Sequence, residues 1–105
     1  MLKITFLDKR TEKEFRDFPP DMAAHFSRTV LLMQEFGTHT IGLPHMCRVS
    51  GTDLWEIRVK GKAGIGRMLY GVNGQEIIIL HAFIKKTQKT PRQAIELAQK
   101  RWKEM

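Results

Sequence analysis

Three consecutive strand-like stretches in the second half of this 105-residue chain constrain its fold more than any other feature. They are LWEIRV at 54–59, IGRMLYGV at 65–72 and EIIILHAFI at 76–84. All three are rich in branched or aromatic residues, which favour extended strands. The connections KGKAG and Asn73-Gly74 are typical of hairpins, and Asn-Gly is the strongest two-residue hairpin signal. The sequence therefore predicts an antiparallel three-stranded meander.

The first half of the chain predicts one strand and a pair of helices. Residues 2–7 alternate between apolar and polar side chains, as a strand does. TEKE, beginning at Thr11, is a capping-box pattern that opens a short helix, and Pro19 ends it. Asp21 then has the position of an N-cap for a longer helix, which Gly37 ends.

The remaining segments predict a loop and a final helix. Residues 38–53 form the loop, with room for one short strand at 46–49. TPRQ at 90–93 begins the last helix, with Pro91 at the first helical position. Spacing along this helix predicts that Ile95, Ala98 and Trp102 are buried.

The predicted order is β-α-α-β-β-β-α in a single domain that spans residues 1–105. This is an α+β fold with a largely antiparallel sheet. Helices on one face of the sheet are the economical arrangement. The other face would then be open to solvent or to a partner.

Positive charge is concentrated in the second half of the chain. Residues 1–53 carry seven Lys or Arg and seven Asp or Glu, whereas residues 54–105 carry eleven and four. The whole net charge of +7 therefore comes from the half that holds the meander. An anionic partner is the natural inference, and nucleic acid is the commonest one; a solubilising surface is the alternative.

Side-chain alternation places polar residues of the meander together on the open face. These residues are Glu56, Arg58, Lys60 and Arg67. Alternation also puts His81 on the opposite side from its neighbours in the third strand, without deciding which side faces the core. The rim beyond this strand is cationic and polar, with Lys85, Lys86, Gln88 and Lys89. Such a group can bind a phosphate backbone by charge and by forked hydrogen bonds.

The stretches LWEIRV, GRMLY and ILHAFIKKTQKTP resemble the RelE/HigB toxins of bacterial toxin–antitoxin systems, in particular the phage-derived HigB-like branch of the RelE/ParE superfamily. The resemblance covers nearly the whole chain. It implies a toxin that cleaves messenger RNA on the translating ribosome and is held inactive by an antitoxin, expected to be a small helix-turn-helix protein. It points to Arg58, Arg67, Lys85 and Lys86 as site residues, with Glu56 and His81 as additions. Toxins of the ParE branch share the fold and poison gyrase, so a non-enzymatic gyrase inhibitor or a phage-derived binding protein remains an alternative.

RNA cleavage without a metal needs a base for the 2′-hydroxyl, cations for the phosphate oxygens and an acid for the leaving 5′-oxygen. Arg58 and Arg67 suit the second role, because a guanidinium fork matches two phosphate oxygens. Glu56, His81 or a lysine are candidates for the base, and His81 or a lysine for the acid. The structural alternative is that the arginines are cross-strand surface charges paired with Glu56, and that His81 is a core histidine.

Several other classes of function lack support in the sequence. His39, His45 and Cys47 have no second ligand cluster at zinc-site spacing, so we expect no metal. Nucleotide-cofactor motifs are absent, so we expect no cofactor. The longest apolar run, at 77–80, is far too short to span a membrane. A single cysteine and the lack of a signal-peptide pattern favour the cytoplasm.

Overall fold

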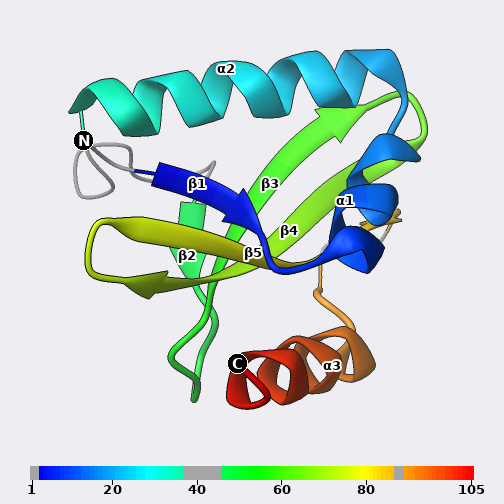
Figure 1. Ribbon diagram of the computed structural model, residues 1–105. Helices are drawn as coiled ribbons and strands as arrows, with labels where there is room; N and C mark the ends of the chain where they lie inside the picture. Colours follow the sequence, from blue (N-terminus) through cyan, green and yellow to red (C-terminus); the bar gives the residue numbers. More distant parts are fainter. Residues whose placement is uncertain (1–2, 37–45, 87–88) are drawn as a thin grey trace.

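The computed structural model describes residues 3–36, 46–86 and 89–105 and contains five strands and three helices within them (Figure 1). In chain order the elements are β1 (Lys3–Phe6), α1 (Lys9–Arg16), α2 (Pro20–Phe36), β2 (Met46–Arg48), β3 (Trp55–Gly61), β4 (Gly64–Asn73), β5 (Glu76–Lys85) and α3 (Arg92–Lys103). The predicted α+β class is confirmed. β2 falls where the sequence left room for a short strand.

The strands form one mixed sheet in the order β1-β5-β4-β3-β2. β1 runs parallel to β5, and the other neighbouring strands are antiparallel. The predicted meander is therefore confirmed as β3, β4 and β5. Its last turn differs by one residue from the prediction, because Asn73 pairs with Glu76 and the two-residue loop is Gly74–Gln75. Gly74 has a φ of 63°, which a glycine adopts without steric cost.

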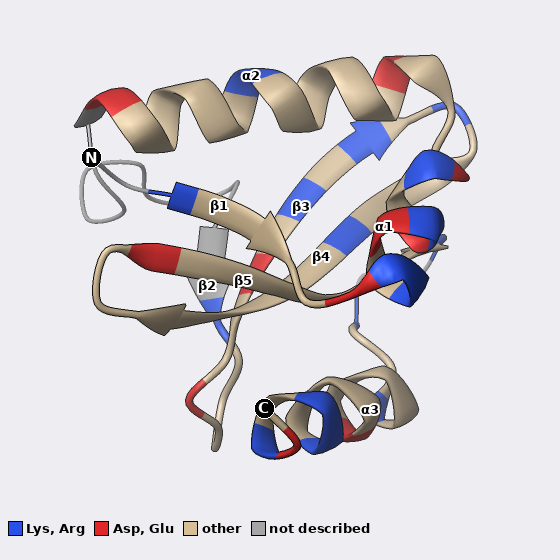
Figure 2. Ribbon diagram, viewed as in Figure 1, with Lys and Arg blue, Asp and Glu red and all other residues tan. Residues whose placement is uncertain are grey.

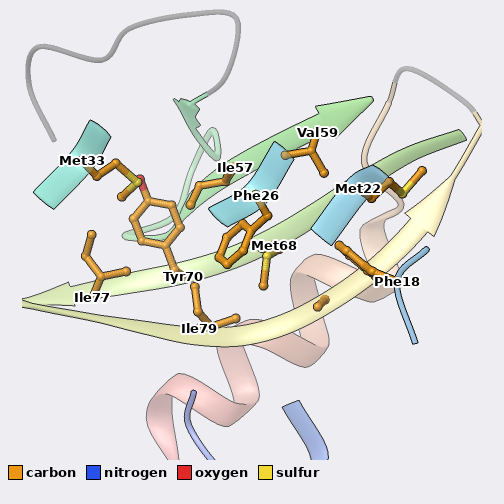
Figure 3. Close-up of a cluster of buried hydrophobic side chains, with 11 residues drawn as sticks. Phe18, Met22, Phe26, Met33, Ile57, Val59, Met68, Tyr70, Ile77 and Ile79 are labelled. Atoms are coloured by element: carbon orange, nitrogen blue, oxygen red, sulfur yellow. The ribbon is translucent and has the colours of Figure 1, made fainter. Parts of the chain in front are cut away.

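Helices cover both faces of the sheet, and the prediction that they share one face is wrong. Figure 1 shows α2 on one side of the sheet and α3 on the other. Under α2 lies a core that includes Met22, Phe26, Met68 and Tyr70 (Figure 3). Tyr70 is 1% exposed and belongs to this core.

A second apolar cluster holds α3 against the opposite face. Leu69 and Leu80 of the sheet pack there with Ala94 and Ala98 of α3. The third strand of the meander, β5, carries apolar residues on both sides, and helices cover both of its faces. Apolar residues on both sides are typical of such a buried strand. Gly71 allows the close approach of α3, since a Cβ at this position would lie 2.6 Å from the Trp102 ring.

The first helix begins earlier than the capping-box pattern predicts. Asp8, not Thr11, is the N-cap of α1, and its carboxylate accepts a hydrogen bond of 3.1 Å from the backbone N–H of Thr11. Asp8 gains a further partner in Arg10, whose Nη2 donates to it at 2.7 Å. The earlier start leaves Thr11 and Glu14 inside the helix, on the side that faces β5.

Candidate functional site

Three rows of paired residues cross β3, β4 and β5 on the face that α3 partly covers. Paired residues of neighbouring strands project their side chains to the same face. The first row is Glu56, Leu69 and His81; the second is Arg58, Arg67 and Phe83; the third is Lys60, Ile65 and Lys85. We call these nine residues the three-row site. The predicted placement of Arg58 and Arg67 on one face is confirmed, and Figure 2 shows the basic positions along β3 and β4.

A β-bulge decides where His81 points. Leu69 pairs with His81 and Tyr70 pairs with Ile79, so Leu80 is an extra residue in β5. The bulge places His81 on the same face as Leu80, which simple alternation did not predict. The His81 and Phe83 rings stack with centroids 4.9 Å apart, as side chains on one face would. His81 therefore joins the three-row site.

The site is less open than the sequence predicts. Arg67 is fully buried, with an exposed fraction of 0%, and Glu56 is 1% exposed. The Arg58 side chain is 31% exposed, and Lys60 and Lys85 are exposed. The expectation that all four polar residues of β3 and β4 lie on an open face is therefore wrong for Glu56 and Arg67, because Thr90 and α3 pack on this face.

Thr90 forms hydrogen bonds with three residues of the site. Its hydroxyl donates a hydrogen bond to Glu56 Oε2, and it accepts from Arg67 Nη1 at 3.2 Å and from Arg58 Nη2 at 3.5 Å. Arg58 also donates through Nε to Glu56 Oε1. The buried Glu56 carboxylate thus has a guanidinium and a hydroxyl as partners. Sequence reasoning missed Thr90, whose only signal was its place before a helix-starting proline.

Glu14 of α1 contacts the other end of the first row. His81 Nδ1 lies 3.0 Å from Glu14 Oε1, and Arg101 Nη1 of α3 lies 3.2 Å from the same oxygen. Burial opposes ionisation of Glu14, but hydrogen bonds from His81, Arg101 and the Ala82 N–H together lower its pKa to about 2. His81 was expected at the site. Glu14 and Arg101 were not, because nothing in their sequence positions indicates contact.

The remaining predicted cations lie in the third row or follow it along the chain. Lys85 ends β5, and Lys86 and Lys89 follow it as exposed residues. Gln88 lies outside the described residues. Of the predicted rim, Lys85 therefore lies in the third row and Lys86 directly after it, and Lys89 is exposed before α3.

The structure bears only in part on the other expectations. Within residues 3–36, 46–86 and 89–105, no group of three or more His, Cys, Asp or Glu side chains is arranged to hold a metal ion. His39 and His45 lie outside these ranges. None of the three described helices is long and apolar enough to cross a membrane.

Residues 13–103 match a family model described as "Phage derived protein Gp49-like". The match covers most of the chain, including every helix and strand except β1 and the first turn of α1. None of the curated proteins matches the chain in sequence.

Several solved toxin structures share this fold. A double arginine-to-alanine mutant of the E. coli toxin RelE in the free state superposes with a TM-score of 0.68 at 16% identity, over 95% of this chain and 96% of that one. The YoeB–YefM complex from Staphylococcus aureus gives 0.60 at 17% identity, over 81% and 98%. A toxin–antitoxin complex, RelBE2 from Mycobacterium tuberculosis, gives 0.52 at 14% identity, over 80% and 98%. The predicted resemblance to RelE-type toxins is thus confirmed at the level of the fold.

Proposed function

Because the chain belongs to the phage-derived Gp49-like family, we propose that it is the toxin of a type II toxin–antitoxin pair and cleaves messenger RNA on the ribosome without a metal ion. The fold is consistent with this proposal, but folds of this kind serve more than one activity. The three-row site therefore carries the proposal.

The observation that carries the proposal is the placement of cations beside two titratable groups on one face. Arg58 stands in the second row, with Lys60 and Lys85 in the third. All three reach solvent and can bind successive phosphates of an RNA strand. Arg67, the buried partner of Arg58 in the second row, adds further positive charge. The exposed Lys86 and Lys89 extend the phosphate-binding surface toward α3.

Glu56 and His81 stand at the two ends of the first row. They are separated by β4, hence by two strand spacings, or roughly 10 Å between their backbones. Side chains that lean inward from such positions can flank one phosphate group, with a base on one side and an acid on the other. His81 is the better candidate for proton transfer, since its side chain is 15% exposed whereas Glu56 is held by Arg58 and Thr90. Phe83, stacked on His81, offers an aromatic edge beside the RNA.

An antitoxin is the second element of the proposal. Two of the similar structures are toxin–antitoxin complexes, YoeB–YefM and RelBE2. A chain with net charge +7 would be matched by acidic side chains on such a partner. We propose a small helix-turn-helix protein in this role. Co-purification of this chain with the product of the neighbouring gene tests this step directly.

The decisive experiment is induced expression followed by mapping of transcript 5′ ends. The wild-type chain should produce new ends within translated regions. The double variant K60A/K85A, which changes two exposed side chains, should lose at least about ten-fold of this cleavage by reduced phosphate binding. The control K62A/K103A removes the same charge from two exposed lysines outside the three rows and should cleave normally.

A gyrase supercoiling assay on the same purified protein separates the alternative. Transcript cleavage with normal supercoiling supports the nuclease. Inhibition of supercoiling without any new transcript ends would replace the proposal with a gyrase inhibitor.

A further inference from the structure

Glu14 joins three elements at one point beside the three-row site. It lies in α1 and contacts the His81 ring and the Ala82 N–H of β5, the latter at 3.1 Å. Arg101 of α3 approaches it with two nitrogens, at 3.2 and 3.3 Å. The Glu14 carboxylate therefore has a fixed place relative to the His81 ring.

The edge of β5 determines where Glu14 and Arg101 lie. β1 pairs with β5 only as far as Phe6 and Ile79, so the backbone of β5 beyond that point needs other partners on that side. The Leu80 carbonyl accepts from Arg101 Nη1 at 2.8 Å, and the Ala82 N–H donates to Glu14. Glu14 and Arg101 thus continue the edge of β5 where β1 ends. Their positions are set by backbone contacts and not only by their mutual charge.

The proton on His81 follows from the state of Glu14. A carboxylate with a pKa of about 2 is ionised at neutral pH and can only accept hydrogen bonds. The close contact of its Oε1 with His81 Nδ1 therefore requires the proton to be on Nδ1. In the neutral ring, Nε2 then carries the lone pair and is the atom able to accept a proton.

We propose that Glu14 is a positioning residue that holds neutral His81 as the Nδ1–H tautomer, so that Nε2 serves as the base for the RNA 2′-hydroxyl. This inference rests on the proposed nuclease function. In the step, Nε2 takes the 2′-hydroxyl proton and the 2′-oxygen forms a bond to phosphorus. The bond from phosphorus to the 5′-oxygen breaks, and that oxygen takes a proton from water. The imidazolium then returns its proton to the hydroxide.

A purely structural role for Glu14, as the link between α1 and α3, predicts different behaviour from a positioning role. R101M removes the link to α3 but leaves Glu14 beside His81. E14L/R101M removes the link and also the partner of Nδ1, and it leaves no uncompensated charge at the 7%-exposed Arg101 position. Because both variants lack the α1–α3 ion pair, a difference between them reports the two remaining contacts of Glu14, with His81 and with the Ala82 N–H, and the tautomer of His81 isolates the first of these.

The tautomer can be read directly by NMR correlation of the His81 ring nitrogens with the ring protons at a pH where the ring is neutral. We expect the Nδ1–H form in the wild-type chain and in R101M, and a shift toward Nε2–H in E14L/R101M. A wild-type ring that carries its proton on Nε2 overturns the proposal, and this measurement does not depend on the folding of any variant.

Cleavage of ribosome-bound messenger RNA completes the test. R101M should keep cleavage within a few-fold of wild type at a temperature where it is folded, whereas E14L/R101M should lose at least roughly 10- to 100-fold, by analogy with the loss of partners that orient metal-bound histidines. Equal cleavage by both variants overturns the positioning role while the nuclease function stands. A wild-type chain that does not cleave RNA removes the nuclease function, and the catalytic role of His81 with it, whatever the tautomer.

Discussion

Arg58 and Arg67 are direct partners across β3 and β4, yet one is 31% exposed and the other is fully buried. Two guanidinium groups on one face would repel each other without a counter-charge. Glu56 and the Thr90 hydroxyl supply the compensation, since Glu56 accepts from Arg58 and Thr90 accepts from Arg67. Arg58 is therefore a cation that reaches solvent, whereas Arg67 is a buried cation within the fold. The two arginines should respond differently to substitution.

Arg67→Ala should destabilise the protein strongly. Removal of a fully buried charged side chain leaves a cavity and takes one hydrogen bond from Thr90, and we expect a loss of roughly 2–4 kcal/mol in the free energy of unfolding. Urea unfolding followed by circular dichroism measures this loss. Surface substitutions stay within about 0.5 kcal/mol, so a change that small would show that Arg67 is exposed in solution.

Arg58→Lys should impair activity more than stability. A lysine keeps the positive charge beside Glu56 but loses the planar guanidinium fork, whose geometry matches two phosphate oxygens. We expect transcript cleavage to fall by on the order of 10²-fold, the effect of removing a donor that stabilises the transition state, with less than about 1 kcal/mol lost in stability. Cleavage at the wild-type rate would exclude Arg58 from phosphate binding.

The sequence was sufficient to predict the meander because local signals agree there. The strand-forming residues, the hairpin turns and the alternation along β3 all indicate the same register, and Arg58 and Arg67 lie on one face as predicted. The covered face was not predictable in the same way. β5 is apolar on both sides, a pattern that does not say where α3 packs. The open-face prediction failed for Glu56 and Arg67 for this reason.

Contacts between distant residues were the other part that the sequence did not reveal. His81 lies at the site because of one extra residue in β5, and a bulge of this kind has no clear signal in ILHAF. Thr90 and Glu14 meet the site residues from 34 and 67 positions away along the chain, respectively. Their own local patterns, a helix start and an apparent capping box, explain their residue types without any role at a site.

Thr90→Val should test the contact that closes the site. Valine has nearly the shape of threonine but cannot donate to Glu56 or accept from Arg67. A buried carboxylate that loses a donor is costly, and we expect the free energy of unfolding to fall by about 1–3 kcal/mol. Thr90→Ser keeps the hydroxyl and is the matched control. Equal stability of the valine and serine variants would mean that the hydroxyl contacts contribute nothing measurable.

Acid should destabilise the protein in a window set by Glu14 and Asp8. Both carboxyl groups have a pKa of about 2 in the folded chain, below their ordinary values of 4.5 and 3.8. For Asp8 the main cause is its hydrogen bond with Arg10, and for Glu14 the bonds from His81 and Arg101 outweigh the effect of burial. A lowered folded-state pKa means that the unfolded chain binds protons first as the pH falls. The stabilisation from each group is therefore complete above its ordinary pKa and is lost as the pH falls toward 2.

Urea unfolding at a series of pH values from 7 to 2 measures this dependence. Stability should decline mainly below about pH 4.5, and E14L/R101M should show a flatter decline because the Glu14 proton is no longer taken up on unfolding. Asp8→Asn should flatten it separately, since asparagine still caps α1 but does not titrate. Glu12, which accepts from Arg16 on the helix surface and whose side chain is 41% exposed, provides the control variant Glu12→Gln, which should leave the contribution of Glu14 to the pH dependence unchanged. A wild-type slope in E14L/R101M would show that Glu14 gains no stabilisation from its partners in the folded chain.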